Sequence, residues 1–172
     1  MPKSFLHTVE HKGFGQNNMA RCWYASYRMM LKYLNRNPDE VKDKLKAVLN
    51  FDDAYENGLF VSDYRKAADA LGMDILDSTP FRKEQTFFDV GLSDGAEAFL
   101  KVLANKPVWV SRFSSVGVYH ITVAVGYDDK ESDIIFNNPF PGPNDAWQSD
   151  KLKANIYVRH ITRQIGSVQM PK

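Results

Sequence analysis

The chain has 172 residues and a formal net charge of +1, from 22 Lys and Arg and 21 Asp and Glu. This length suits a single domain that buries about two thirds of the surface of its unfolded chain. The balanced charge gives no indication of nucleic acid or of an anionic membrane as a partner. The single cysteine excludes an internal disulfide and fits a reducing compartment. The first residues lack the long apolar segment of a signal peptide, and no stretch is apolar enough to span a bilayer.

The chain up to about residue 105 has the pattern of loops and helices. Residues 1–15 are expected to form a loop or an edge strand, and residues 51–59 a turn-rich linker. Segment 73–92 has no clear pattern, and its part 80–92 is compatible with a surface loop that lines a cleft. Capping residues and apolar periodicity predict four helices. These span about 20–35, 37–49, 63–71 (capped by Ser62 and closed by Gly72) and a segment from a capping box at Asp94 and Glu97 to Ala104.

After Lys106 and Pro107 the pattern changes to strands rich in β-branched and aromatic residues. The predicted strands span 108–113, 119–127, 133–138 and 154–162. Because the helices come first and the strands second, the expected fold class is α+β. We expect a single domain over 1–172, with a helical half at about 16–105 packed on an antiparallel β half at about 106–165. A cleft is expected where the two halves meet.

The only cysteine, Cys22, lies at the start of the first predicted helix. An apolar stripe identifies that helix, and its members are Trp23, Tyr27, Met30 and Leu34. Unpaired backbone N–H groups and the positive end of the helix dipole favour a thiolate at Cys22. Six positions upstream, the side-chain amide of Gln16 can donate a hydrogen bond. A nucleophile beside a donor for an oxyanion is the arrangement that acyl transfer requires.

His120 and Asn138 lie on two strands that are predicted to form a hairpin. His120 opens the strand 119–127, and the polar turn at 128–132 folds the next strand back. In this register Asn138 lies directly or diagonally across from His120, whereas Asn137 faces the other way. An asparagine that accepts from the imidazole N–H fixes the orientation and the tautomer of the ring. The choice between Asn138 and Asn137 stays open at this point.

The pattern Gln-x5-Cys-Trp at Gln16, Cys22 and Trp23 resembles the active-site signature of papain-like cysteine peptidases. The context NNMARCWYAS is more similar to the compact bacterial members, which include double-glycine leader peptidases and some pathogen effector proteases. In these families a His on one strand is followed by Asn or Asp near the end of the next. The resemblance implies the two-part fold given above and a triad of Cys22, His120 and Asn138, with Asn where many compact bacterial members have Asp.

The resemblance also implies a function, that of a cysteine protease cleaving peptide bonds within protein substrates. Cys22 and His120 are expected to rest as a thiolate–imidazolium pair, with the oxyanion held by Gln16. Phe140 occupies the place where papain relatives often carry a Trp that covers the His–Asn bond. Trp23 and Phe140 are therefore the candidate substrate-binding residues.

The resemblance to double-glycine leader peptidases suggests cleavage after small residues such as Gly-Gly. Only fifteen residues precede Gln16, too few to fold over a cleft, so we expect restraint by a separate inhibitor protein or by tight substrate choice rather than by an inhibitory leader. A bacterial effector or toxin domain fits this expectation, either cytoplasmic or delivered by a signal-independent route into a recipient cell and restrained by a cognate immunity protein. The expected partners are thus a protein or peptide substrate and that inhibitor.

Two alternatives remain open at this point. One is an amidase, a deamidase or an acyltransferase that uses the same triad. The other is a catalytically idle binding module. No cofactor is expected, and no spacing of His, Cys and Asp indicates a metal site. His7, His11 and His160 lack a comparable context and are interpreted as surface or structural residues.

Overall fold

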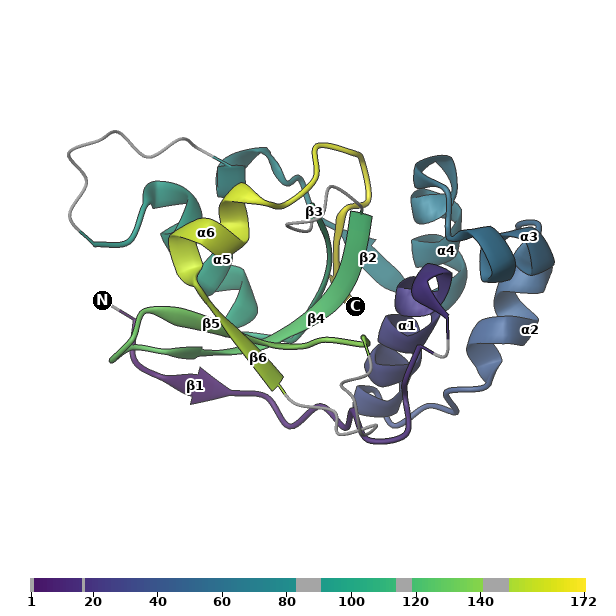
Figure 1. Cartoon of the computed structure of the whole chain (residues 1–172), viewed down its shortest axis with the longest axis horizontal. Helices are drawn as coiled ribbons and strands as arrows, with labels where there is room; N and C mark the ends of the chain where they lie inside the picture. The colour runs from purple at the N-terminus through teal and green to yellow at the C-terminus, as the bar shows by residue number, and fades with distance from the viewer. Residues whose placement is uncertain (1, 17, 83–90, 114–118, 141–148) are drawn as a thin grey trace.

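A computed structural model describes residues 2–16, 18–82, 91–113, 119–140 and 149–172. These residues form an α+β fold with one antiparallel sheet and helices on both of its faces (Figure 1). The helices are η1 (Met19–Arg21), α1 (Cys22–Tyr33), α2 (Glu40–Lys46), α3 (Phe51–Asn57), η2 (Val61–Asp63), α4 (Tyr64–Leu71), η3 (Thr79–Arg82), α5 (Asp94–Leu103) and α6 (Ala154–Arg159). The strands are β1 (Phe5–Leu6), β2 (Met73–Ile75), β3 (Val108–Phe113), β4 (Tyr119–Asp128), β5 (Asp133–Asn137), β6 (Ser149–Lys153) and β7 (Val168–Pro171).

The strands follow the spatial order β2-β7-β3-β4-β5-β6, and every pairing among the described strands is antiparallel. One edge of β4 pairs first with β3 and then, further along, with β1. Its other edge pairs with β5 only from Val123 onward, where Val123 lies opposite Asn137. The first residues of β4 therefore have an edge that no strand covers within the described part of the chain.

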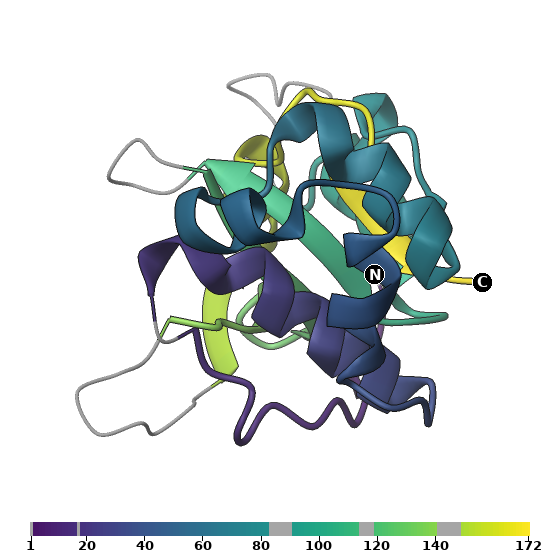
Figure 2. The same cartoon turned by 90° about the vertical axis from the view of Figure 1, so that its right-hand side faces the viewer.

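Two hydrophobic clusters lie on the two faces of the sheet. Helices α1–α4 pack on one face around Trp23, Tyr27 and Trp109, and in Figure 2 they lie in front of the strands. Helices α5 and α6 pack on the other face around Phe99 and Tyr157. Alternation along β4 serves both clusters, because successive side chains point to opposite faces. Ile121, Val123 and Val125 join the α1 cluster, whereas Ala124 joins the α5–α6 cluster. Tyr127 also joins the α5–α6 cluster, because the pairing with β5 shifts register between Ala124 and Gly126.

Most predicted elements are present, and the exceptions have local causes. The expected linker at 51–59 contains helix α3, which Asn50 caps by accepting from the Asp53 N–H at 3.4 Å. The expected strand at 154–162 is wrong, because the chain forms helix α6 there and buries Ala154, Tyr157 and Val158 at helical spacing. Helix α5 begins at Asp94 itself, so its cap is Ser93, one residue before the predicted cap Asp94.

Two further differences concern segments that carried weak sequence signals. Ser62 lies in the 3-10 turn η2 and does not cap α4, whereas Gly72 ends that helix in the left-handed conformation as predicted. Strands β2, β6 and β7 were not predicted. Most of the proposed cleft loop at 80–92 lies outside the described residues. None of the described helices is long and apolar enough to cross a membrane.

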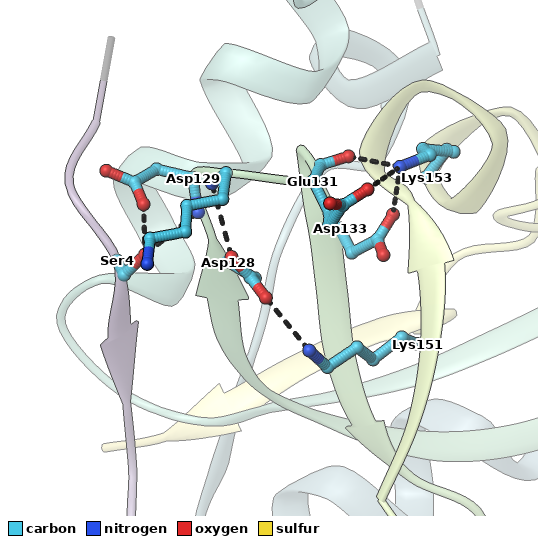
Figure 3. Close-up of polar contacts among 8 residues, drawn as sticks. Ser4, Asp128, Asp129, Glu131, Asp133, Lys151 and Lys153 are labelled. Carbon is cyan, nitrogen blue, oxygen red and sulfur yellow. Dashed lines mark hydrogen bonds and ion pairs between the residues drawn. The ribbon is translucent and has the colours of Figure 1, made fainter.

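The predicted polar turn between β4 and β5 is held by lysines of β6 (Figure 3). Lys151 contacts Asp128 at 2.8 Å, and Lys153 contacts both Asp133 at 3.1 Å and Glu131 at 3.4 Å. The pKa of Asp128 lies below its usual value, chiefly because of its hydrogen bond with Lys151. Exposed pairs of this kind contribute little to stability. Each of these three carboxylates has a lysine partner, which favours a structural role for the turn.

We predict that Gly126→Ala destabilises the fold by displacing β1. A methyl group at this position would lie 2.6 Å from the backbone oxygen of Phe5 and 3.1 Å from Cα of Leu6. The overpacking should cost about 1–3 kcal/mol, measured by urea unfolding. A chain that lacks residues 2–6 serves as the control background, because the clashing atoms are absent there. An equal cost in both backgrounds would contradict the explanation.

Candidate active site

Cys22 begins helix α1 and lies at the uncovered edge of β4. The hydroxyl of Ser26, one turn further along α1, donates to the backbone oxygen of Ile121 at 3.3 Å. Ser111, the β3 partner of Ile121, uses its own N–H and oxygen for Ser167 and Thr162. The backbone groups of Ile121 are therefore turned away from β3 and toward α1. This contact places the first turn of α1 against the residue that follows His120.

The thiol of Cys22 is 6% exposed and has backbone donors around it. Burial raises its pKa to about 11, although hydrogen bonds from the backbones of Ile121, Trp23 and Cys22 oppose the rise. The donors at the helix start are thus present, as expected, but desolvation outweighs them. The structure therefore favours a protonated thiol, whereas a resting thiolate was expected from the sequence.

His120 and Asn138 lie together, as expected from the hairpin. The Nε2 atom of His120 is 2.7 Å from Oδ1 of Asn138. The amide group of Asn138 in turn donates to Asp150 at 2.7 Å, and its Oδ1 also accepts from the Phe140 N–H at 3.1 Å. His120, Asn138 and Asp150 therefore form a chain that connects the start of β4 with β6.

The polarity of this chain assigns the histidine tautomer. An ionised Asp150 can only accept, so the NH₂ end of Asn138 faces it and the carbonyl oxygen faces His120. The proton on a neutral His120 then resides on Nε2, which leaves Nδ1 free to accept a proton. Burial lowers the pKa of His120, and the bond to Asn138 opposes that effect. Both members of the expected ion pair are thus favoured in their neutral forms.

The two asparagines at the end of β5 have different environments. Asn137 is 1% exposed, donates to the backbone oxygen of Val9 at 3.2 Å and accepts from Ser149 at 3.0 Å. Those contacts are structural, whereas Asn138 contacts the imidazole. Among the described residues no hydrogen bond joins the sulfur of Cys22 to His120.

Gln16 connects the segment before α1 to the end of β5. Its backbone N–H donates to the oxygen of Pro139 at 3.1 Å. Its buried side chain donates from Nε2 to the oxygen of Met19 at 3.3 Å, while Oε1 has no partner in the described structure. The amide thus has one N–H contact within the turn that leads to Cys22 and a second N–H to offer.

A pocket of about 470 Å³ opens beside the cysteine. Its walls come from the turn before α1, from the segment after α3 and from the start of β4. They include Cys22, Trp23, Leu59, Tyr64, Tyr119 and Ile121. Most of these side chains are apolar, so the pocket suits an apolar side chain rather than a charged one.

The two candidate substrate-binding residues differ in exposure. Trp23 lines this pocket but is 1% exposed, and its ring N–H donates to the oxygen of Ala54 at 3.2 Å. It serves the core as well as the pocket. Phe140 is 50% exposed and contributes its backbone N–H to Asn138.

The sequence did not identify two contributors, Asp150 and the backbone of Ile121. Asp150 follows residues 141–148, which lie outside the described structure, and a sequence gives no register for the strand that carries it. Among the described residues no group of three His, Cys, Asp or Glu side chains is placed to hold a metal ion.

The chain was compared with known proteins. The family model described as "Papain-like cysteine protease AvrRpt2" matches residues 7–155. The match spans Cys22, His120 and Asn138 and most of the helical and β elements. No curated protein matches the chain.

We predict that alkylation of Cys22 by iodoacetamide rises by about tenfold per pH unit from pH 6 to pH 9, because only the small thiolate fraction reacts. A thiol with a pKa of about 11 should still gain in rate above pH 9, whereas free cysteine levels off above its pKa of about 8.5. The rate is measured by mass spectrometry on the intact protein. His120→Ala, the matched control, should give the same profile. A plateau from pH 6 upward that disappears in His120→Ala would instead establish a resting ion pair.

We predict that Asp150→Ala lowers kcat/KM by about tenfold, the value of one charged hydrogen bond. The negative charge of Asp150 raises the pKa of His120. Its removal should therefore shift the acidic limb of the pH–rate profile to lower pH. Asp150→Asn should keep an acceptor for Asn138, retain more activity and still shift the profile.

The matched control is Asp133→Asn, a carboxylate on β5 that pairs with Lys153. It should leave the acidic limb in place. An unshifted limb in both Asp150 variants would show that this residue does not act through His120.

Proposed function

We propose that this chain, which belongs to the AvrRpt2 family of papain-like cysteine proteases, is an endopeptidase with Cys22 as nucleophile and His120 as general base and acid. In this proposal Asn138 orients His120, and Gln16 helps to hold the oxyanion. The observation that carries the proposal is the chain of hydrogen bonds from His120 through Asn138 to Asp150. It fixes a histidine next to Ile121, and Ile121 and Cys22 line the same pocket.

The proposed reaction begins from a neutral pair. As the sulfur of Cys22 attacks the scissile carbonyl, the thiol proton passes to the free Nδ1 of His120. The oxyanion accepts hydrogen bonds from the Gln16 amide and from the Cys22 backbone N–H. His120 then donates its proton to the leaving amine, and afterwards it activates the water that hydrolyses the thioester. Asn138 keeps the ring in one tautomer throughout.

The geometry around the cysteine supports a preference for a small residue at the cleaved bond. Cys22 is 6% exposed, so the scissile carbonyl has to approach its sulfur closely. A glycine at that position removes the side chain that would obstruct this approach. Cleavage after small residues such as Gly-Gly is therefore proposed. The adjacent apolar pocket supports a large apolar side chain nearby in the substrate.

The proposed setting is the cytoplasm of a recipient cell, where the chain acts as an effector or toxin domain and a cognate inhibitor protein restrains it elsewhere. A single thiol without a disulfide partner supports action in a reducing compartment. Two apolar residues that line the pocket, Met19 and Phe60, are 70% and 51% exposed and offer contact area for a protein substrate.

We predict that wild-type chain expressed in cells generates new protein termini that are absent with Cys22→Ala. Mass-spectrometric mapping should find small residues on the amino side of these cuts. Cells that express the wild type should grow more slowly than cells that express Cys22→Ala. Gln16→Ala should cut at the same positions with kcat lower by about 10²-fold, because one oxyanion donor is lost and the backbone contact to Pro139 remains.

The control is that Cys22→Ala unfolds with the wild-type transition in urea, since the loss of a sulfur should leave the packing of α1 in place. Equal sets of termini from the wild type and a folded Cys22→Ala would refute the assignment of the nucleophile.

A further inference from the structure

A second pocket, of about 370 Å³, lies on the α6 side of the sheet and is rich in arginine. Arg82 comes from η3, Arg159 from the end of α6, and Arg163 from the segment that follows it. His160 lines the same pocket. Three guanidinium groups and one imidazole from two separate stretches of the chain therefore line one cavity, although the net charge of the whole chain is only +1.

These arginines have no carboxylate partners within the described structure. Elsewhere Arg21 pairs with Glu56, Arg28 with Asp39 and Arg36 with Glu40, at 2.9–3.1 Å. No ion pair of Arg82, Arg159 or Arg163 occurs among the described residues.

Two groups of the arginine pocket have pKa values below their usual ones. The pKa of Arg82 is lowered by burial and then by Arg163. The pKa of His160 is lowered by burial and then by Arg112 and Arg159. Arg112 itself is buried, stacks on Phe136 and Tyr157, and is stabilised in its charged form by Tyr157 and Asp150, so it is not part of this pocket's unpaired charge. A cluster of arginines without a carboxylate partner among the described residues favours an anion in the cavity.

The arginine pocket adjoins the pocket of Cys22. Tyr119 lines both cavities. The Gln164 amide, in the wall of the arginine pocket, donates to the Tyr119 hydroxyl at 3.3 Å. The segment after Gln164 also packs closely on the cysteine pocket. A methyl group added at Gly166 would lie only 3.0 Å from Tyr64, which lines that pocket. A ligand that extends from the cysteine past Tyr119 therefore meets the arginines.

The walls between the two pockets suit a peptide. Phe113 and Tyr119 pack edge to face at 5.1 Å and are 45% and 48% exposed. Such half-exposed rings can lie against an extended chain while guanidinium groups bind its carboxylates. A free inorganic anion would use the arginines but would gain nothing from these rings.

We propose that the pocket lined by Arg82, Arg159 and Arg163 is a specificity site for an acidic side chain of the protein substrate, a few residues from the cleaved bond. This inference rests on the proposed protease function. It adds a charge requirement to the small and apolar preferences given above. Guanidinium groups in a fixed fork bind a carboxylate through two parallel hydrogen bonds, which distinguishes Glu or Asp from Gln or Asn of the same shape.

The test uses fluorogenic peptides built on a cut mapped with the wild-type chain. The peptides form pairs: at each of four positions on either side of the bond, one peptide carries Glu and its partner carries Gln. At one position the Glu peptide should have a kcat/KM about two- to fivefold above that of its Gln partner at low ionic strength, the value of a partly exposed charge pair. The difference should lie in KM and should decrease in high salt.

Variants then locate the preference. Arg163→Gln and Arg159→Gln should each reduce the Glu/Gln ratio toward one, and the ratio is taken within each variant so that overall activity cancels. Arg163→Glu should invert the charge preference: at that position a peptide with Lys should have a higher kcat/KM than the peptide with Glu. The matched control is Lys42→Gln, an exposed charge on α2 that lines neither pocket; its ratio should equal that of the wild type.

Two results would overturn the proposal. One is a Glu/Gln ratio near one at every position in the wild type. The other is a ratio that persists in both arginine variants. If inorganic phosphate alters cleavage of the Gln peptides while no acidic preference exists, the pocket binds a free anion and the substrate assignment is wrong.

A binding measurement separates this inference from the proposed function. Fluorescence anisotropy with Cys22→Ala should show tighter binding of the Glu peptide than of the Gln peptide, and Arg163→Gln in that background should remove the difference. This arm needs no turnover. If no peptide is cleaved by the wild type, the proposed function fails, whereas equal binding of both peptides would refute the acidic site alone.

Discussion

The site depends on one contact, the docking of the first turn of α1 on the free edge of β4. Because β5 begins to pair only at Val123, the backbone of Ile121 is left to the helix, and Ser26 and Cys22 use it. A backbone group buried without a partner would be costly, so this edge requires the helix as much as the helix requires the sheet. The same strand carries His120 one residue earlier. The position of Cys22 relative to His120, the proposed nucleophile and base, is thus set by backbone contacts.

This docking also explains why the cysteine is difficult to ionise. The sulfur lies between the helix start and a strand edge, where three backbone donors face it, yet it is almost completely removed from water. Desolvation of a full charge outweighs a few partial positive charges. Burial lowers the pKa of His120, which likewise favours its neutral form. For the proposed protease, a neutral pair of this kind favours transfer of the proton during attack over a standing thiolate.

The sequence predicts elements well where local signals and tertiary environment agree. Strand 108–113 matches β3, since its β-branched and aromatic residues are buried in the sheet. The prediction from sequence fails at 154–162. There Ile156, Tyr157 and Val158 favour a strand, but packing of Tyr157 on Phe99 stabilises a helix. For the site, the pairing of His120 with Asn138 follows from hairpin periodicity. Asp150 does not follow, because its position requires the register of β6. Nor does a sequence reveal how deeply the cysteine is buried, which here decides its protonation state.

The polar residues divide between pairing and recognition. At the β4–β5 turn the lysines of β6 pair with Asp128, Glu131 and Asp133 and offset most of their negative charge (Figure 3). Asp150, on the same strand as those lysines, instead stabilises Asn138 and through it the imidazole. On the α6 side the arginines are left without such partners among the described residues. Since the arginine pocket and the cysteine pocket share Tyr119, the proposed acidic specificity site lies where an extended substrate would continue past the cysteine. Among the described residues, the acidic side chains of the β4–β5 turn have lysine partners and maintain structure. The three arginines beside the cysteine pocket have no such partner in the described part of the chain, and in our proposal the substrate supplies their counter-ion.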